Sequence, residues 1–482
     1  MEFTRRNFVQ SSATAAIVYK LVGNSPAMKA AGANDQIRLG MIGMGIRGSY
    51  HLKTLKPLPG VRLAMVADVY DGHLAWAKEV TDGAIDTTRD YRAVLDRKDI
   101  DAVVIATPDH WHMPMVLDSL SAGKHVFIEK PMTYSIEEGP KIIDAVKKSG
   151  KLLMVGSQHA TTPIGQKARE IVKSGALGKI NMVRMSNQRN TPGGAWVYAI
   201  APDASPQTID WDRWLGRAPK RPFDAKHFFR WRCWWEYSGG VSSDLWVHMF
   251  TRLHTVLDCG APKSAVAQGA ILRWNDGRAV PDVMSGLYEY DGFLVDVCAD
   301  LGNANDICNG TVIMGSEGTL VMPTKTADDT LVLYPEAPAP EYNTSGMDSW
   351  PKATREKYLA SIGLGNRKPD KVKAKPMQTI PVERGPEHNE WFIRSLRDGT
   401  PSREDATFGH CAAGAAHLGN VAFRSGKRAR WDFAGSASPL VTNVAPFTAT
   451  RDSRSKTCRG MESATASDVA EPSGLSRNST MT

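Results

Sequence analysis

Between residues 37 and 157, short runs of apolar residues alternate with stretches of helical periodicity. The apolar runs at 37–42, 61–69, 101–108 and 125–131 have the length and continuous hydrophobicity of buried parallel strands. A helical stretch, MPMVLDSLSAG at 113–123, separates the last two runs. Repeated alternation of strands and helices predicts an α/β fold built on a parallel sheet.

The first apolar run leads directly into a glycine-rich turn with the spacing G-x-G-x-x-G, and SYHLKTLKPL after it can continue as a helix. In this context the first glycine permits a tight turn, and the second lets the backbone approach a pyrophosphate. The third glycine lets the helix pack against the strand, and the helix N-terminus favours negative charge. The turn therefore predicts a dinucleotide site made by Gly43, Met44, Gly45, Ile46, Arg47 and Gly48.

An acidic residue, Asp68, ends the second apolar run. It follows Gly48 by about twenty residues, the distance at which a carboxylate binds the adenosine ribose hydroxyls and disfavours a 2′-phosphate. The predicted cofactor is therefore NAD. NADP is the alternative, because neighbouring loop residues can overrule one carboxylate.

The composition narrows the function classes. The 482 residues, 42% hydrophobic and 23% charged, are typical of a globular chain of two or three domains. The net charge of +8 is spread without a long Lys/Arg block, so no nucleic-acid partner is expected. None of the six cysteines forms a C-x-x-C pair, so zinc ribbons and thioredoxin-type motifs are excluded and buried free thiols are expected.

The N-terminus has features of a targeting segment. Thr4-Arg5-Arg6-Asn7-Phe8 resembles a twin-arginine export signal, and Ala31-Gly32-Ala33 supplies small residues for a cleavage site. Residues 1–33 are therefore predicted to be a signal, and the protein to be periplasmic or secreted. Lys20 shortens the apolar stretch, so an amphipathic or disordered arm on a cytoplasmic protein is the alternative. No other run approaches the 18 apolar residues of a membrane span, so no stable membrane anchor is predicted.

The segment ATPDHWHMPMVLDSLSAGKHVFIEKPM at 106–132 closely resembles the Gfo/Idh/MocA oxidoreductases, named for glucose–fructose oxidoreductase and inositol dehydrogenase. The resemblance continues through LLMVGSQHATTPIGQKAREIVKSGALGKI, YSGGVSSDLWVHMFTRLHTVLD and VIMGSEGTLVM, and it covers roughly residues 36 to 432. It implies an N-terminal Rossmann domain followed by an α+β domain whose large, mostly antiparallel open sheet faces the substrate and often makes homo-oligomer contacts.

The domain boundaries follow from this resemblance. We predict an NAD-binding domain at 36–157 and a substrate and oligomerisation domain at 158–432, with helices near the C-terminus packing back on the body. Residues 323–386 are rich in Pro, Lys and Asp and are predicted to be surface loop or insertion. The Ser-, Thr- and Ala-rich residues 434–482 are predicted to be a disordered tail.

Three residues are predicted to carry the chemistry. Lys130 ends a parallel strand, where open α/β sheets bind their ligands, and a lysine there can stabilise charge on an alcohol oxygen. Asp244 and His248 are four residues apart and would share a helix face, so that the carboxylate fixes the imidazole tautomer and raises its basicity. The resemblance implies catalytic roles for all three. The family that the chain resembles often has another Asp where this chain has Thr251, so the detailed sugar contacts are left open.

The resemblance also implies residues around the nicotinamide half of the cofactor: Thr107, Pro108, His112, Glu129, Lys130 and Gln158. A metal site at His110 and His112 is not predicted, because nothing nearby completes a ligand set. The segment FFRWRCWWEYSGG at 228–240 either stacks on a sugar ring or forms a core or oligomer contact. The Pro- and Gly-rich stretch at 190–216 is predicted to be a long loop that covers the site.

The leading functional hypothesis is an NAD(P)-dependent oxidoreductase that transfers a hydride to or from a hydroxyl-bearing carbon of a carbohydrate or cyclitol. The alternative is a glycoside hydrolase with a resident NAD, which oxidises, eliminates, hydrates and reduces in turn. A non-catalytic sugar-binding protein is a third hypothesis, which Lys130, Asp244 and His248 argue against. The expected partner is a small sugar or glycoside.

Overall fold

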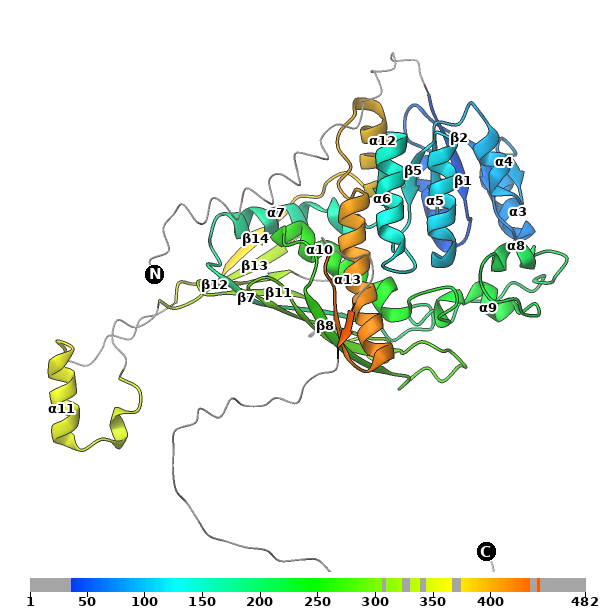
Figure 1. Cartoon of the computed structure of the whole chain (residues 1–482). Coiled ribbons are helices and arrows are strands. Elements are labelled where there is room, and N and C mark those ends of the chain that lie inside the picture. The colour runs from blue at the N-terminus through cyan, green and yellow to red at the C-terminus, as the bar shows by residue number, and fades with distance from the viewer. Residues whose placement is uncertain are drawn as a thin grey trace, which may run out of the picture. The chain divides into compact units, whose positions relative to one another are not determined.

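The computed structural model describes residues 36–305, 309–322, 330–338, 344–365, 374–433 and 440–442 (Figure 1). The predicted signal at 1–33 and nearly all of the predicted tail lie outside these ranges. No helix within the described ranges is long and apolar enough to cross a membrane.

The N-terminal domain is a six-stranded parallel sheet flanked by helices, as predicted. The strand order β3-β2-β1-β4-β5-β6 is that of a Rossmann fold. The central strands are almost entirely buried, which explains their unbroken apolar sequences. The elements are β1 (Ile37–Ile42), α2 (Ile46–Leu55), β2 (Val61–Ala67), α3 (Asp71–Val80), β3 (Asp86–Thr88), α4 (Tyr91–Asp96), β4 (Ala102–Ile105), η1 (Asp109–Trp111), α5 (His112–Ser121), β5 (His125–Ile128), α6 (Glu138–Ser149) and β6 (Leu153–Val155).

The second domain contains a ten-stranded sheet in the order β14-β13-β12-β11-β7-β10-β9-β8-β15-β16. One pair, β7 with β10, is parallel, and the other pairs are antiparallel, so the predicted mostly antiparallel sheet is confirmed. The strands are β7 (Ile180–Gln188), β8 (Ser264–Ala270), β9 (Val283–Glu289), β10 (Leu294–Asp300), β11 (Gly310–Gly315), β12 (Gly318–Met322), β13 (Thr330–Pro335), β14 (Gln378–Pro381), β15 (Arg428–Arg430) and β16 (Leu440–Thr442).

Helices cover the inner face of this sheet (Figure 1). They include the long α13, which packs on β8 and α10. The helical elements of the domain are η2 (Gln158–Ala160), α7 (Pro163–Lys173), α8 (Trp211–Leu215), α9 (Ala225–Phe229), η3 (Trp231–Cys233), η4 (Ser242–Trp246, a π-helical turn), α10 (Val247–Leu257), η6 (Met347–Ser349), α11 (Lys352–Ser361), α12 (His388–Asp398) and α13 (Ala406–Ser425).

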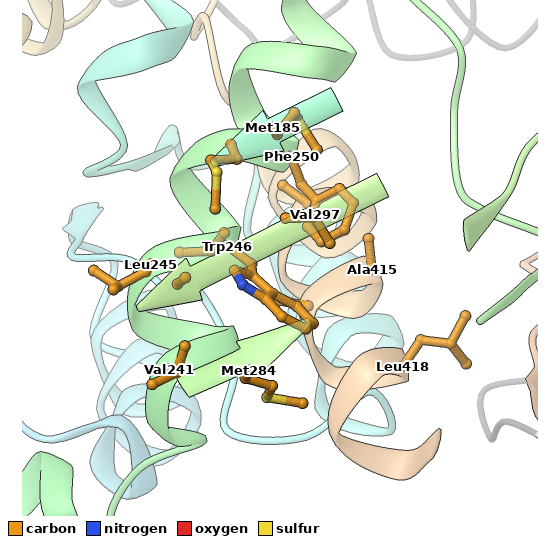
Figure 2. Packing of buried hydrophobic residues seen from close by; sticks show 14 of the residues in the cluster. Met185, Val241, Leu245, Trp246, Phe250, Met284, Val297, Ala415 and Leu418 are labelled. Atoms are coloured by element: carbon orange, nitrogen blue, oxygen red, sulfur yellow. The ribbon is translucent and has the colours of Figure 1, made fainter. Parts of the chain in front are cut away.

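The core of the second domain surrounds Trp246, which is fully buried between the η4–α10 helix, the sheet and α13 (Figure 2). Met284 and Val297 of the sheet and Leu418 of α13 belong to the same apolar cluster. A Cβ at Gly419 would lie 2.2 Å from the Tyr288 hydroxyl and 2.8 Å from the Trp246 ring. This position therefore needs glycine for α13 to approach the sheet.

Two loop predictions were wrong in part. Residues 323–386 contain the strands β13 and β14 and the helix α11, because the alternating sequence at 330–335 pairs with β12 at the sheet edge. Residues 440–442, predicted to lie in a disordered tail, form β16 and pair with β15. The prediction of buried free thiols is confirmed for Cys233 and Cys411, whereas Cys259 and Cys298 are free but only partly buried. Cys308 and Cys458 lie outside the described residues.

Candidate functional site

The glycine turn after β1 has the geometry that a dinucleotide requires. Gly43 has φ +86°, and a Cβ at Gly48 would lie 2.0 Å from the Gly43 carbonyl oxygen, so both positions need glycine. A Cβ at Gly45, by contrast, would meet no described protein atom within 4 Å. The space beside Gly45 opens at the N-terminus of α2, where a phosphate is favoured. The residues therefore fit the pyrophosphate of a dinucleotide.

Asp68 lies at the end of β2 beside this turn. Its carboxylate accepts hydrogen bonds from the backbone N–H groups of Met44 (2.5 Å) and Tyr70 (2.9 Å), and it contacts His73 Nδ1 at 3.1 Å. Burial alone would raise the pKa of Asp68, but His73 and the two N–H groups lower it below its ordinary value. Met44 thus contributes through its backbone, while its side chain is buried in the core.

A cavity of about 430 Å³ runs along the carboxyl ends of the Rossmann strands. Nine residues predicted to bind the cofactor line it: Gly43, Gly45, Ile46, Arg47, Asp68, Thr107, Pro108, Glu129 and Lys130. Its other wall comes from the second domain and includes Tyr198, Trp214, Phe228, Phe229, Trp231 and Arg232. The cavity is therefore shared by a predicted cofactor site and residues from outside the Rossmann domain.

Residues 198–232, here called the covering segment, tie this second wall to the Rossmann domain. The Tyr70 hydroxyl donates to Asp203 (2.5 Å), and the backbones of Tyr70 and Ile209 form a β-bridge. Trp111 Nε1 donates to the Trp214 carbonyl at 2.8 Å. These contacts reach residues that follow β2 and β4, so the predicted covering loop at 190–216 does lie over the site.

Four residues predicted to bind the cofactor do not line this cavity: Met44, Gly48, His112 and Gln158. His112 is buried, and its ring nitrogens lie 2.6 Å from the Pro131 carbonyl and 3.0 Å from the Thr107 carbonyl. The ring thus joins two cavity loops, and its proximity to the nicotinamide stays a prediction. Gln158 lies in the short helix η2, outside the residues that line the cavity.

Glu129 lines the cavity, but its carboxylate is engaged by basic side chains. Its Oε1 accepts from Arg47 Nε (2.9 Å) and contacts His51 Nε2 (2.7 Å). Burial opposes ionisation of Glu129, but the two basic side chains lower its pKa below the ordinary value. His51 also contacts Asn389 at 3.0 Å, so the network joins α2, β5 and α12. Glu129 therefore holds the glycine turn against the strand that ends at Lys130.

The structure brings Lys130 and Asp244 together. Lys130 Nζ donates to Asp244 Oδ1 at 2.7 Å and to the Asp244 backbone carbonyl at 2.9 Å. The same carboxylate accepts from Arg232 Nε (2.9 Å) and Trp196 Nε1 (3.1 Å). Burial alone would raise the pKa of Asp244, but Lys130, Arg232 and Arg189 lower it well below its usual range. Asp244 is therefore a fixed negative charge that positions Lys130.

The predicted pairing of Asp244 with His248 is wrong in its geometry. Both oxygens of Asp244 bond to other side chains, and His248 Nδ1 is buried without a hydrogen-bond partner among the described residues. Asp244 lies in the π-helical turn η4, whose wider turn changes which residues face one another across four positions. Burial and Lys130 hold the pKa of His248 well below its usual range. The imidazole is thus neutral and able to accept a proton.

One buried carboxyl in this cluster, Asp109, was not predicted from the sequence. Asp109 is the first residue of η1, in the loop after β4, and is 2% exposed. Within the described residues its carboxyl accepts two long hydrogen bonds, from the Gly239 N–H and the Ser243 hydroxyl, each at 3.4 Å. Burial raises its pKa from 3.8 to about 7, against the opposing charges of Lys130 and Arg232. Its place after an apolar strand, between the predicted Pro108 and the two histidines, was the available signal.

The aromatic segment at 228–240 contributes both to the cavity wall and to the core, and its stacking on a sugar stays a prediction. Phe228, Phe229, Trp231 and Arg232 line the cavity, whereas Cys233, Trp234 and Tyr237 are buried in the core of the second domain. His110 is also buried, with Nε2 at 3.1 Å from the Trp214 carbonyl. In the part of the chain that the structure describes, no group of three or more His, Cys, Asp or Glu side chains is arranged to hold a metal ion.

Two family models match the chain. The first, described as an oxidoreductase family with an NAD-binding Rossmann fold, matches residues 37–157. The second, the GFO/IDH/MocA C-terminal domain, matches residues 166–321, and the two together cover more than half of the chain.

Curated relatives match shorter stretches. The Uncharacterized oxidoreductase YrbE of Bacillus subtilis (strain 168) is 31% identical over 158 residues, which are 33% of this chain and 46% of that protein. An Alpha-N-acetylgalactosaminidase of Shewanella oneidensis is 37% identical over 130 residues, which are 25% of this chain and 28% of that protein. The chain thus spans less than half the length of either relative.

A solved structure shows the same fold. The aldose-aldose oxidoreductase from Caulobacter crescentus, complexed with glycerol, matches with a TM-score of 0.58 over 82% of this chain and 100% of that chain. The sequence identity is 16%.

Proposed function

The chain belongs to the Gfo/Idh/MocA oxidoreductase family and has its NAD-binding Rossmann domain, and from this premise we propose that it transfers a hydride between NAD and a hydroxyl-bearing carbon of a carbohydrate or cyclitol. The observation that carries the proposal is the Lys130–Asp244 pair at the end of β5. It places an ammonium group in the wall of a cavity that begins at the glycine turn. The aldose-aldose oxidoreductase of the same fold supports a sugar substrate.

NAD, when bound, supplies the carbon that accepts or returns the hydride. Lys130 donates a hydrogen bond to the reacting oxygen and stabilises the negative charge that develops on it. Asp244 keeps the lysine in place, and its own low pKa prevents it from taking the proton. His248 is neutral and close to this cluster, so a ring nitrogen is available to accept the hydroxyl proton, and its lowered pKa makes it a weaker base than an ordinary imidazole. The aromatic wall of the covering segment excludes water from the reaction.

The variant His248→Asn tests this assignment. We expect turnover to fall by about 10²–10⁴-fold, because a general base is lost, while the affinity for NAD measured by calorimetry stays within about twofold. The readout is NADH absorbance with a panel of aldoses, uronates and cyclitols. Lys130→Met should lose turnover similarly. Full turnover by His248→Asn would refute the role of this residue.

A glycoside hydrolase with a resident NAD is the second candidate. Two observations favour it: the Shewanella relative is an Alpha-N-acetylgalactosaminidase, and the covering segment is tied over the cavity by side-chain and backbone contacts. The protein purified without added nucleotide and then denatured would release about one nicotinamide per chain. Product analysis separates the two candidates, because the hydrolase releases free sugar without accumulating NADH.

We also propose that residues 1–33 direct export through the twin-arginine route, so that the folded protein acts in the periplasm or outside the cell. Arg5 and Arg6 ahead of an apolar stretch support this proposal. A reporter fused to residues 1–35 should be exported, and changing both arginines to lysine should abolish export. Equal export of the two fusions would overturn it.

We further propose that the chain forms a homo-oligomer through the outer face of the ten-stranded sheet. Leu287, Leu294 and Tyr334 are 43%, 44% and 45% exposed. The strand registers place all three on the face opposite the helices, together with partly buried residues such as Met182 and Val312. An apolar open face of this kind supports association.

A further inference from the structure

The end of the cavity at Lys130 has more positive than negative charge. Lys130 and Arg232 both line the cavity, and both bond to one carboxylate, that of Asp244. A third cation, Arg189, acts on the same carboxylate and on His248, lowering the pKa of each. Two cations of the cavity wall thus bond to one ionised carboxylate, and Arg189 adds further positive charge.

The other carboxyl groups nearby do not restore the balance. Glu129 is already paired with Arg47 and His51. Asp109 is kept mainly protonated below neutral pH by its burial. The positive excess grows when the nicotinamide ring is in its oxidised, cationic form. Charges held in a poorly solvated cavity are costly unless an anion offsets them.

Arg232 is arranged to bind such an anion. Its side chain is 17% exposed, and its guanidinium stacks on the Trp231 ring at 4.2 Å. Asp244 accepts from Nε, and within the described part of the chain it is the one carboxylate in an ion pair with Arg232. The guanidinium is therefore held in place at one nitrogen, and it lines the cavity with a planar donor group suited to a carboxylate.

Arg189 follows the last residue of β7 and makes fewer side-chain contacts than Arg232. Its Nε donates to the Asn187 side chain at 3.1 Å. No carboxylate of the described residues lies within ion-pair distance of its guanidinium. This arginine therefore supplies charge beside Asp244 and His248 without holding another acidic residue.

We propose that the substrate of this site is a sugar acid, whose carboxylate binds Arg232 in the cavity wall and is attracted by the added charge of Arg189, while a hydroxyl of the same molecule lies at Lys130. The inference rests on the proposed function and names the substrate class within it. In this proposal the two arginines determine substrate specificity, whereas Lys130 and His248 act on the reacting hydroxyl.

Matched sugar pairs test the inference, because glucuronate differs from glucose, and galacturonate from galactose, by a carboxylate in place of a hydroxymethyl group. With NAD present, kcat/KM should be at least about tenfold higher for the acid of the preferred pair. Arg189→Gln should raise KM for the acid about tenfold and change kcat little. Because Arg232 also holds Asp244, Arg232→Lys is the milder second variant, and it should weaken acid binding more than aldose binding.

Arg184→Gln is the control for net charge. Arg184 lies on β7, is 63% exposed and pairs with Asp296, away from the cavity-lining residues. This variant should keep the acid preference of the unchanged protein. A parent aldose that reacts as well as its acid would overturn the inference while the proposed function stands.

If no sugar changes NADH absorbance, a binding measurement distinguishes failure of the proposed function from failure of the inference. The NAD-loaded protein is then titrated calorimetrically with both members of each matched pair. Tighter binding of the acid, lost in Arg189→Gln, would support the acid specificity and refute the proposed hydride transfer. Equal or absent binding of both members would overturn the inference as well.

Discussion

Single side chains in the site differ from their ordinary states for identifiable reasons. Asp244 stays ionised in a buried place because three donors bond to it, whereas Asp109, with two weak donors, has a pKa raised to about 7. His248 stays neutral because burial and a neighbouring ammonium group disfavour its charge. Two carboxyls in one cluster thus have different protonation states, which separates a fixed charge from a titrating group.

The raised pKa of Asp109 predicts a pH-dependent stability. The folded protein retains a proton on Asp109 that the unfolded chain releases near pH 3.8, so the free energy of unfolding falls as pH rises from about 4 to 7. The loss is at most about 1.4 kcal/mol per pH unit. Asp109→Asn should remove this dependence. The variant's free energy of unfolding measured in urea should therefore rise, relative to that of the unchanged protein, between pH 5 and pH 7.5.

Asp82→Asn is the control for this measurement, because the Asp82 side chain is 94% exposed. Its stability difference from the unchanged protein should be the same at both pH values. If Asp109→Asn behaves like this control, then Asp109 titrates normally and the account of its environment is wrong.

The two glycines of the turn predict opposite effects of the same added methyl group. Gly45→Ala fills open space beside the turn, so NAD affinity should fall at least about tenfold while thermal stability changes little. Gly48→Ala forces a Cβ against the Gly43 carbonyl, so the fold should lose about 1–3 kcal/mol. Calorimetry and thermal melts of both variants check this, and equal NAD affinity in Gly45→Ala would contradict a phosphate site there.

At this scale the sequence predicted residue types better than their partners. Lys130 and Asp68 could be placed because strand ends of a parallel sheet meet at one edge. Arg232, Trp196 and Asp109 could not be placed around Asp244, because folding of the second domain sets their proximity. The spacing of Asp244 and His248 predicted a contact between them because a regular α-helix was assumed, whereas the chain has a π-helical turn there.

At the scale of elements, the covering segment joins the two domains over the cofactor cavity. It is mostly irregular, with the short helices α8 and α9, and contacts residues that follow the Rossmann strands. Arg217 extends these ties by pairing with Glu138 at the start of α6. We therefore expect these ties to slow the dissociation of a cofactor bound beneath the segment.

Loosening the covering segment should therefore speed cofactor release. The double variant Asp203→Ala/Arg217→Ala removes two ties without changing a cavity-lining residue. We expect the NADH dissociation rate to rise about tenfold, corresponding to loss of two modest polar contacts, with little change in melting temperature. Stopped-flow displacement of NADH measures the rate.

Lys220→Ala is the matched control, because Lys220 pairs with Asp212 inside the same segment. It should leave the dissociation rate unchanged. A double variant that releases NADH no faster than this control would show that the segment does not limit release.

Element prediction succeeded where apolar runs were long and failed at the sheet edge. The runs at 37–42, 61–69, 101–108 and 125–131 correspond to β1, β2, β4 and β5, because buried parallel strands need continuous apolar sequence. β13 and β14 are short and lie among Pro and Lys residues, and β14 pairs with β13 across the long segment between them. Local sequence therefore gave too little evidence for them.

At the scale of the whole molecule, the outer face of the large sheet predicts an assembly. Light scattering should give a mass greater than one chain. Leu287→Glu/Leu294→Glu adds charge beside Glu289 and Asp296 on the same face and should shift the protein to monomers. Leu272→Glu, at a position 73% exposed outside the strands, should not. A monomeric unchanged protein would refute the assembly.

The position of β7 determines how the large sheet can form. The strands β8 to β10 and β11 to β13 are each joined by local antiparallel pairing, but among the described residues the sheet connects these two groups through β7. Val183 of β7 pairs with Val295 and with Ile313, both more than a hundred residues later in the chain. During synthesis β7 therefore emerges long before either neighbour, with both edges unpaired and Val183 and Met185 uncovered. Completion of the sheet is a high-contact-order step, which folds slowly and leaves β7 the segment most exposed to wrong pairing.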